Sequence, residues 1–362
     1  MRRGATLGVG AMTLPTRAPR PGGVLHLRRS PLLRPLPGMA FAEAMEWARR
    51  GGPLRTPFPY DEAHLHVHDA ERMTRPLLAS LLVRAAGRRA WIEDDAGGRR
   101  AVGAAEIARR AAAVARDLAR APGLRRRVER RVARLERETA APPPPGEGPP
   151  LYLRTDLWFG VRTGGAAAHV AGVVNHLGDF FAPPVVLSTD DLPLVRPEVE
   201  VHRVRPPAEF WDFRELPNLR FNEFFPPAAR RLLGGRRPGW VYQRYSEYDF
   251  AGVELARGWG VPLVLEFNAP ALWVARHWGS GLRYEALADR IERLALRSAA
   301  RVVVVSEPLA ALVRERGVPA ERILVNPNGV EPDRFTPAAD GARVRARLGL
   351  EGRVVGFIGT FG

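Results

Sequence analysis

The chain has 362 residues, 46% of them hydrophobic and 26% charged, a composition that allows a large buried core and excludes wholesale disorder. Its 55 basic and 39 acidic residues give a net charge of +16, and because it has no cysteine, disulfide and thiol chemistry are excluded. No stretch approaches the roughly 18 continuous apolar residues of a membrane span, and the length predicts two or three domains at roughly 150 residues each.

Residues 1–38 are rich in Pro, Gly and Arg without periodicity, so we expect them to be disordered. Residues 39–141 read as a basic, mainly helical appendage that includes one strand and turn from Arg89. Apolar residues at three- and four-residue spacing predict two helices between Ala104 and Glu138, separated by a break at Pro122-Gly123. Pro142 to Pro150 form a stiff Pro-rich linker and the clearest domain boundary.

The two predicted helices are almost solid Arg on their outer faces, which leaves three interpretations. The first is plain helical packing with a solvated Arg face, and the second is docking to an anionic membrane surface or a partner. Nucleic-acid binding is the least favoured, because no aromatic side chain for stacking on bases lies between Trp91 and Tyr152.

His64, His66 and His68 alternate beside Asp69, and on a strand alternate residues share one face. Three imidazoles on one face could bind zinc. A surface strand or loop without a metal is the other interpretation, and it is favoured because no further His or Cys cluster lies near in the sequence.

From Leu151 onward, short apolar runs alternate with helical patterns. Runs that are apolar on both faces belong to a parallel sheet covered on both sides, so residues 151–340 predict an α/β domain with a doubly wound, Rossmann-like parallel sheet. We expect strands at 151–154, 185–188, 199–204, 240–243, 262–267, 301–306, 323–326 and 353–358, and helices at 165–177, 247–259, 282–298 and 308–316.

Ligands of such sheets bind beyond the carboxyl ends of the strands. The loop after the first strand reaches Gly164 and Gly165 at the start of a helix, where two glycines let a phosphate or a sugar approach the backbone. This pair is a weak signal, since it is not G-x-G-x-x-G and the chain has no P-loop Lys.

Four segments in order resemble family-4 glycosyltransferases. The segment from Ile323 to Phe335 (ILVNPNGVEPDRF) is similar to the signature I-P-N-G-V-D-x-x-x-F of that family, and RVVVVSEPL from Arg301 resembles the strand and loop before it. Gly164-Gly165 with His169 resembles the first glycine-rich loop, and RVVGFIGT from Arg353 resembles the opening strand of the second domain.

The resemblance implies a GT-B architecture, of which residues 151–340 are the N-terminal, acceptor-side half. It implies a hexosyltransferase-like enzyme that transfers a sugar from a nucleotide-sugar to a glycan or glycolipid, with retention of configuration and without a metal or other cofactor. No catalytic residue can be assigned. The substrate-binding residues it implies are Gly164, Gly165, His169, Glu266, Asn268, Ser306, Glu307, Asn328, Gly329 and Glu331, with Gly359 on the donor side.

Several of these residues also have a structural interpretation. Glu266 and Asn268 could bind a substrate hydroxyl, or Glu266 could be a strand-end carboxylate paired with an Arg. His169 could steady the acceptor or lie at the core edge, and Asn328-Gly329 could serve only as a left-handed turn. The aromatic stretch from Phe210 to Pro227 could line the cleft or pack in the core.

Three further expectations complete the interpretation. The chain stops near the start of the second domain (341–362), so we expect a fragment without transfer activity on its own. We expect a role in polysaccharide or glycolipid biosynthesis in the cytoplasm, with the inner membrane face as a site of peripheral contact. A non-catalytic binding module and a GT-B-type sugar-nucleotide epimerase are the alternatives. The adjacent pairs Asp94-Asp95 and Asp190-Asp191 are interpreted as solvated turns.

Overall fold

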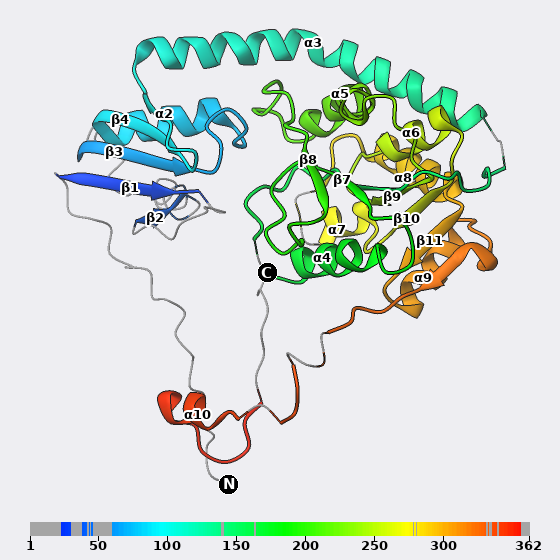
Figure 1. The fold of residues 1–362 in the computed structure, drawn as a ribbon. Helices are drawn as coiled ribbons and strands as arrows, with labels where there is room; N and C mark the ends of the chain where they lie inside the picture. The colour runs from blue at the N-terminus through cyan, green and yellow to red at the C-terminus, as the bar shows by residue number, and fades with distance from the viewer. Residues whose placement is uncertain are drawn as a thin grey trace. The chain divides into compact units, whose positions relative to one another are not determined.

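The computed structural model describes residues 23–29, 38–41, 43, 45, 60–138, 141–162, 164–277, 279, 281–330, 332, 335–338 and 340–355. The chain divides into two compact units, one of residues 20–327 and one of residues 1–19 with 328–362. The second unit carries one described helix, α10 (Ala342–Leu348). Both sheets lie in the unit of residues 20–327 (Figure 1).

A seven-stranded sheet forms the larger part of this unit, in the order β12-β11-β10-β9-β6-β7-β8. All of its strand pairs are parallel. The strands are β6 (Pro150–Arg154), β7 (Val185–Ser188), β8 (Glu200–Arg203), β9 (Trp240–Arg244), β10 (Leu263–Glu266), β11 (Arg301–Val304) and β12 (Ile323–Val325). The helices between them are α4 (Gly165–Leu177), α5 (Leu216–Leu233), α6 (Ala251–Trp259), α7 (Ala271–His277), α8 (Glu285–Ser298) and α9 (Glu307–Glu315).

The sheet is apolar on both faces, and both faces are covered by helices. On one face Tyr152 and Tyr242 pack with Val170 and Val174 of α4. On the other face, alternate strand residues such as Leu151 and Leu153 pack in the core with residues of α5, α6 and α8. This is the doubly wound, Rossmann-like arrangement that the continuous apolar runs predicted.

A second, five-stranded sheet precedes it, in the order β2-β1-β3-β4-β5. Its strands are β1 (Val24–Arg28), β2 (Met39–Ala40), β3 (Tyr60–Val67), β4 (Gly87–Asp94) and β5 (Arg99–Ala101). All pairs are parallel except that of β4 with β5. Helix α2 (Pro76–Ala86) packs on one face, where Leu65 and Val83 are fully buried.

One long helix, α3 (Ala104–Arg137), lies along both sheets (Figure 1). Its first turns contact α2, and its second half contacts α5 and α8. Leu124, Val128 and Val132 have no exposed surface and belong to the core of the larger sheet. The apolar face of this half is therefore occupied, in agreement with plain helical packing and a solvated Arg face.

Several expectations differ from the structure. The helix does not break at Pro122, which lies inside it. Proline removes only the bond to the carbonyl of residue 118, and because Leu118 and Pro122 lie on the exposed side, solvent can replace that bond. The strand β1 falls inside the segment expected to be disordered, and the five-stranded sheet was not anticipated among the helices.

The histidine strand also differs from one of its interpretations, whereas part of the aromatic stretch packs in the core, as one of its interpretations expected. β3 is a central strand, with His64 7% and His66 9% exposed, so it is not a surface strand. In the part of the chain that the structure describes, no group of three or more His, Cys, Asp or Glu side chains could hold a metal ion. Residues 216–233 form helix α5, and Phe221 and Phe225 lie in the core.

Candidate functional site

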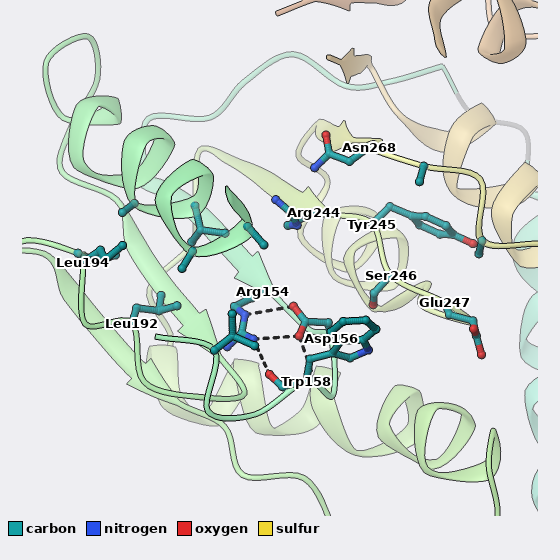
Figure 2. Close-up of a pocket in the computed structure, with 18 of the residues that line it drawn as sticks. Arg154, Asp156, Trp158, Leu192, Leu194, Arg244, Tyr245, Ser246, Glu247 and Asn268 are labelled. Atoms are coloured by element: carbon teal, nitrogen blue, oxygen red, sulfur yellow. Dashed lines mark hydrogen bonds and ion pairs between the residues drawn. The ribbon is translucent and has the colours of Figure 1, made fainter. Parts of the chain in front are cut away.

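A pocket with a volume of about 420 Å³ opens at the carboxyl edge of the seven-stranded sheet. This is the edge at which ligands of parallel sheets bind, and the volume lies in the range of small-molecule sites. Polar residues line it where strands end, among them Arg154 after β6, Arg244 at the end of β9 and Asn268 after β10. Leu192 and Leu194 lie across the pocket from Arg244 and Asn268 (Figure 2).

The first turn of α4 contributes Ala166 and Ala167 to the pocket lining. Gly164 caps this helix with φ 99°, a left-handed conformation that glycine adopts without strain, and no side chain caps the helix. Added Cβ atoms at Gly164 and Gly165 would meet nothing within 4 Å, so the backbone is open there. The N–H groups at such a helix start favour an anionic or hydroxyl-bearing ligand.

Glu266 lies beneath the pocket, 1% exposed, and is surrounded by polar partners. Its Oε1 lies 3.0 Å from His169 Nε2 and 3.1 Å from an Arg244 guanidinium nitrogen. The Tyr242 hydroxyl donates to Oε2 at 3.1 Å, and the Asn268 amide donates to Oε1 at 2.5 Å. Burial raises the pKa of Glu266, but the hydrogen bond from His169 and the charge of Arg244 outweigh it, so the net pKa is lowered.

This cluster contains the ion pair that the structural interpretation of Glu266 expected, because the carboxylate at the end of the strand pairs with Arg244. Through that pairing it also fixes Arg244 and Asn268, both of which line the pocket. Glu266 is thus a positioning residue under the pocket, whereas Arg244 and Asn268 face the ligand space. Binding of a substrate hydroxyl by Glu266 stays a prediction.

A second ion pair fixes the loop after β6. Arg154 donates to both carboxylate oxygens of Asp156 at 3.0 and 3.1 Å, and to the Trp158 carbonyl at 2.6 Å (Figure 2). The Trp158 N–H donates back to Asp156 at 3.1 Å. Yet the Trp158 residue is 76% exposed, so a rigid backbone presents a large aromatic ring to solvent at the pocket mouth.

Glu247 is a functional candidate that the sequence did not indicate. It follows β9, lines the pocket, and forms no hydrogen bond or ion pair with any described residue. Burial and the nearby charge of Glu215 raise the pKa of Glu247 to about 7, against the opposing charge of Arg214. A carboxyl group that titrates near neutrality in a pocket can accept or donate a proton, or bind a hydroxyl.

The other predicted site residues fall in different places. Ser306 is the N-cap residue of α9 and Glu307 is the exposed first residue of that helix, beyond the end of β11. Neither lines the pocket. Asn328 and Gly329 belong to the other compact unit. Glu331 and Gly359 lie outside the described residues, and the described start of the predicted strand 353–358, residues 353–355, is not in a strand.

Comparison with known proteins identifies the class of domain. Residues 164–329 match the model of the glycosyl transferase 4-like domain. The D-inositol 3-phosphate glycosyltransferase of Streptomyces scabiei (strain 87.22) is 32% identical over 140 residues, which cover 35% of this chain and 29% of that protein. The chain therefore spans less than a third of the length of this curated relative.

Solved structures of low similarity are also found. The structure of Anabaena Alr3699/HepE in complex with UDP is 16% identical with a TM-score of 0.37, covering 56% of this chain and 50% of that one. Sucrose-phosphate synthase from Thermosynechococcus elongatus is 18% identical with a TM-score of 0.42, covering 56% and 53%.

The doubly wound parallel sheet with a pocket at its carboxyl edge defines a Rossmann-like domain. The part of the chain that carries most of this sheet is similar to the glycosyl transferase 4-like domain. No described helix is both long and apolar enough to span a bilayer.

Proposed function

We propose that this chain provides the acceptor-binding part of an enzyme that transfers a hexose from a nucleotide-sugar to a glycan or glycolipid. The observation that carries the proposal is the 420 Å³ pocket at strand ends inside the family-matched domain. Its polar side offers Arg244, Asn268 and Glu247 to hydroxyl groups, and its apolar side offers Leu192 and Leu194 to the body of the acceptor. The family resemblance supports retention of configuration and transfer without a metal ion.

Acceptor binding can be tested by probing a glycan and glycolipid array with the chain. Leu194, 43% exposed, forms part of the pocket wall, so Leu194→Asp is expected to abolish binding to the recognised glycan by placing a charge against the acceptor body. Leu118→Asp is the matched control, because Leu118 is 61% exposed on α3 and does not line the pocket. Binding that survives Leu194→Asp, or no bound glycan at all, would contradict the proposal.

We also propose that the protein acts at the cytoplasmic face of a membrane and contacts the lipids by electrostatic attraction alone. The apolar face of α3 is buried in its second half, whereas Arg126, Arg130 and Arg137 are exposed and have no acidic partner among the described residues. Flotation with vesicles containing anionic lipid tests this contact, which should vanish in neutral vesicles and weaken in high salt. Equal flotation with neutral vesicles would refute it.

A further inference from the structure

A separate cavity of about 280 Å³ lies at the carboxyl edge of the smaller sheet. Arg29 follows β1 and His68 follows β3, so both lie where these parallel strands end. The loop before α2 adds Arg72 and Thr74 to the lining. Trp158 completes the wall and also lines the 420 Å³ pocket, so the two cavities are neighbours across one exposed ring.

Every described acid beside this cavity already has cationic partners. Asp69 lies 3.1 Å from both Arg72 and Arg205. His68 Nδ1 lies 2.9 Å from Asp95 and its Nε2 lies 3.6 Å from Asp190. Hydrogen bonds to Asp190 raise the pKa of His68 above its ordinary value against the effect of burial, so the imidazole holds its proton more readily.

These contacts correct the interpretation of Asp190 as a solvated turn residue. Asp190 is 3% exposed and also accepts a hydrogen bond from the Gly160 N–H. Burial opposes the charged form, but His68 and the backbone donors lower the pKa of Asp190 to about 2. The carboxylate is therefore already paired, with His68 across the two sheets and with Arg203, whose guanidinium nitrogen lies 3.4 Å away.

Two arginines in this part of the structure have no carboxylate partner among the described residues. Among the described residues no carboxylate pairs with Arg29 or Arg75, and Arg29 Nη1 is buried without a hydrogen-bond partner. The Arg29 guanidinium lies 4.7 Å from the ring centroid of Phe41. Burial, and to a smaller extent the charge of Arg75, lowers the pKa of Arg29. A guanidinium group that lines a cavity with a buried, unpaired N–H favours an anion beside it.

The backbone of Arg75 gives a second, independent sign of function. Its φ of 52° and ψ of 60° are left-handed, an unfavourable conformation for a side chain as large as arginine. The conformation is held by the Arg75 N–H, which donates to the Trp211 carbonyl at 2.8 Å, and by the start of α2. Strained residues that persist in this way concentrate at ligand sites.

We propose that this cavity is a second binding site, for a small ligand that carries an oxyanion, such as a sugar phosphate or a sugar acid. Arg29 lines the cavity and neutralises the phosphate or carboxylate through its unpaired Nη1, and Arg75, which follows the lining residue Thr74 in the chain, adds a second positive charge. Trp158 and Trp211 offer aromatic surface to the ring that bears the anion. The oxyanion follows from the charges alone, whereas the sugar part rests on the proposed function. The family match covers only Trp211 of the side chains named here, because it begins at residue 164.

Isothermal titration calorimetry of the full chain tests the site with glucose 6-phosphate, glucuronate, glucose and inorganic phosphate. The two anionic sugars are expected to bind, and glucose is expected to show no heat at the same concentrations. If only glucose 6-phosphate binds, the ligand is a phosphate ester; if only glucuronate binds, it is a sugar acid. If inorganic phosphate binds as tightly as glucose 6-phosphate, the oxyanion site stands and the sugar part is overturned.

Two variants and one control localise the binding. Arg75→Gly removes the charge while glycine accepts the left-handed backbone, and Arg29→Gln removes the other charge; each should lower the affinity at least tenfold. Arg88→Gln removes an equal charge from an exposed position at the opposite end of the smaller sheet and should leave the affinity within twofold. This control matters because a chain of net charge +16 attracts anions unspecifically.

The proposal is overturned if glucose binds as tightly as the anionic sugars, if Arg88→Gln weakens binding as much as the site variants, or if both site variants bind like the parent. The assay measures binding without transfer. Failure of the array experiment with intact oxyanion binding would therefore refute only the proposed function, and the reverse result would refute only this second site.

Discussion

Replacing Glu266 by glutamine should destabilise the protein, because it removes the buried charge that pairs with Arg244 and contacts His169. Glu266 is 1% exposed, and the side chains of His169 and Arg244 are 15% and 22% exposed. Removing one partner of such a buried pair costs about 3–5 kcal/mol, since the other charge is left uncompensated. Glutamine keeps the size and one carbonyl acceptor for Tyr242, so we expect about 3 kcal/mol for Glu266→Gln.

The pH dependence of this loss has a defined sign. The pKa of Glu266 is lowered in the folded protein, so its contribution is complete above the unfolded pKa of about 4.3 and disappears as the pH falls through the lower folded value. The difference in unfolding free energy between the parent and Glu266→Gln should be largest at neutral pH. It should shrink steadily below pH about 4.3.

Urea unfolding followed by circular dichroism measures both effects. Arg244→Gln and the double variant complete a mutant cycle, in which the double variant should lose less than the sum of the single losses. Glu321→Gln serves as a control, because Glu321 is exposed and has no partner among the described residues; it should change stability by less than about 0.5 kcal/mol. A cost below about 1 kcal/mol for Glu266→Gln at neutral pH, or a cost independent of pH, would refute the reasoning.

Three further predictions concern other parts of the chain. Leu135→Ala should lower the unfolding free energy by about 2–5 kcal/mol, whereas Leu118→Ala on the same helix should cost less than about 0.5 kcal/mol; similar urea midpoints for both would contradict the packing of α3. Pro122→Ala should stabilise the protein by about 2 kcal/mol, because up to about 1 kcal/mol of the helical gain is lost to the freer unfolded chain; a lower melting temperature would disprove an intact helix there. Glu247→Gln should become more stable than the parent as the pH rises from about 4.3 to above 7, by on the order of 3 kcal/mol, because the folded protein resists the ionised form; pH-independent melting curves would exclude the raised pKa.

The sequence predicted the larger sheet well, because its signals are local. Helix 165–177 has the predicted bounds, and seven of the predicted strands occur within about two residues of them. Helix α5 was not predicted, since the stretch from Phe210 to Pro227 was interpreted only as lining the cleft or packing in the core. The helix tolerates three prolines, Pro217, Pro226 and Pro227. Pro217 lies in the first turn, where its missing N–H costs nothing, and the buried aromatic face outweighs the other two.

The smaller sheet carried a signal that could have been used. Leu25 and Leu27 alternate with polar residues in β1, and Ala63, Leu65 and Val67 alternate with histidines in β3. Such alternation is typical of a strand. The histidine motif therefore indicates a strand, whereas the burial of His64 and His66 depends on the neighbouring strands β1 and β4.

The candidate site was predicted only in part, because its contacts join distant segments. The carboxyl-edge loops were predicted from the parallel sheet, as were Glu266 and Asn268. That His169 would contact Glu266, 97 positions away in the chain, depends on how α4 packs on β10. Glu247 has no sequence signal at all, since its raised pKa arises from burial and from Glu215 rather than from neighbours of a motif.

Because α3 is one continuous helix, the number of its residues sets the distance between the two sheets. Each residue added to an α-helix advances it by about 1.5 Å and turns it by about 100°. One extra residue in the exposed stretch near Leu118 would therefore rotate Ile107 and its sheet about the helix axis while Leu124 stayed in its core. Such a rotation would break the contacts of His68 with Asp190 and of Arg72 with Pro206. Insertion or deletion of a single residue in this helix is therefore incompatible with the contacts between the two sheets.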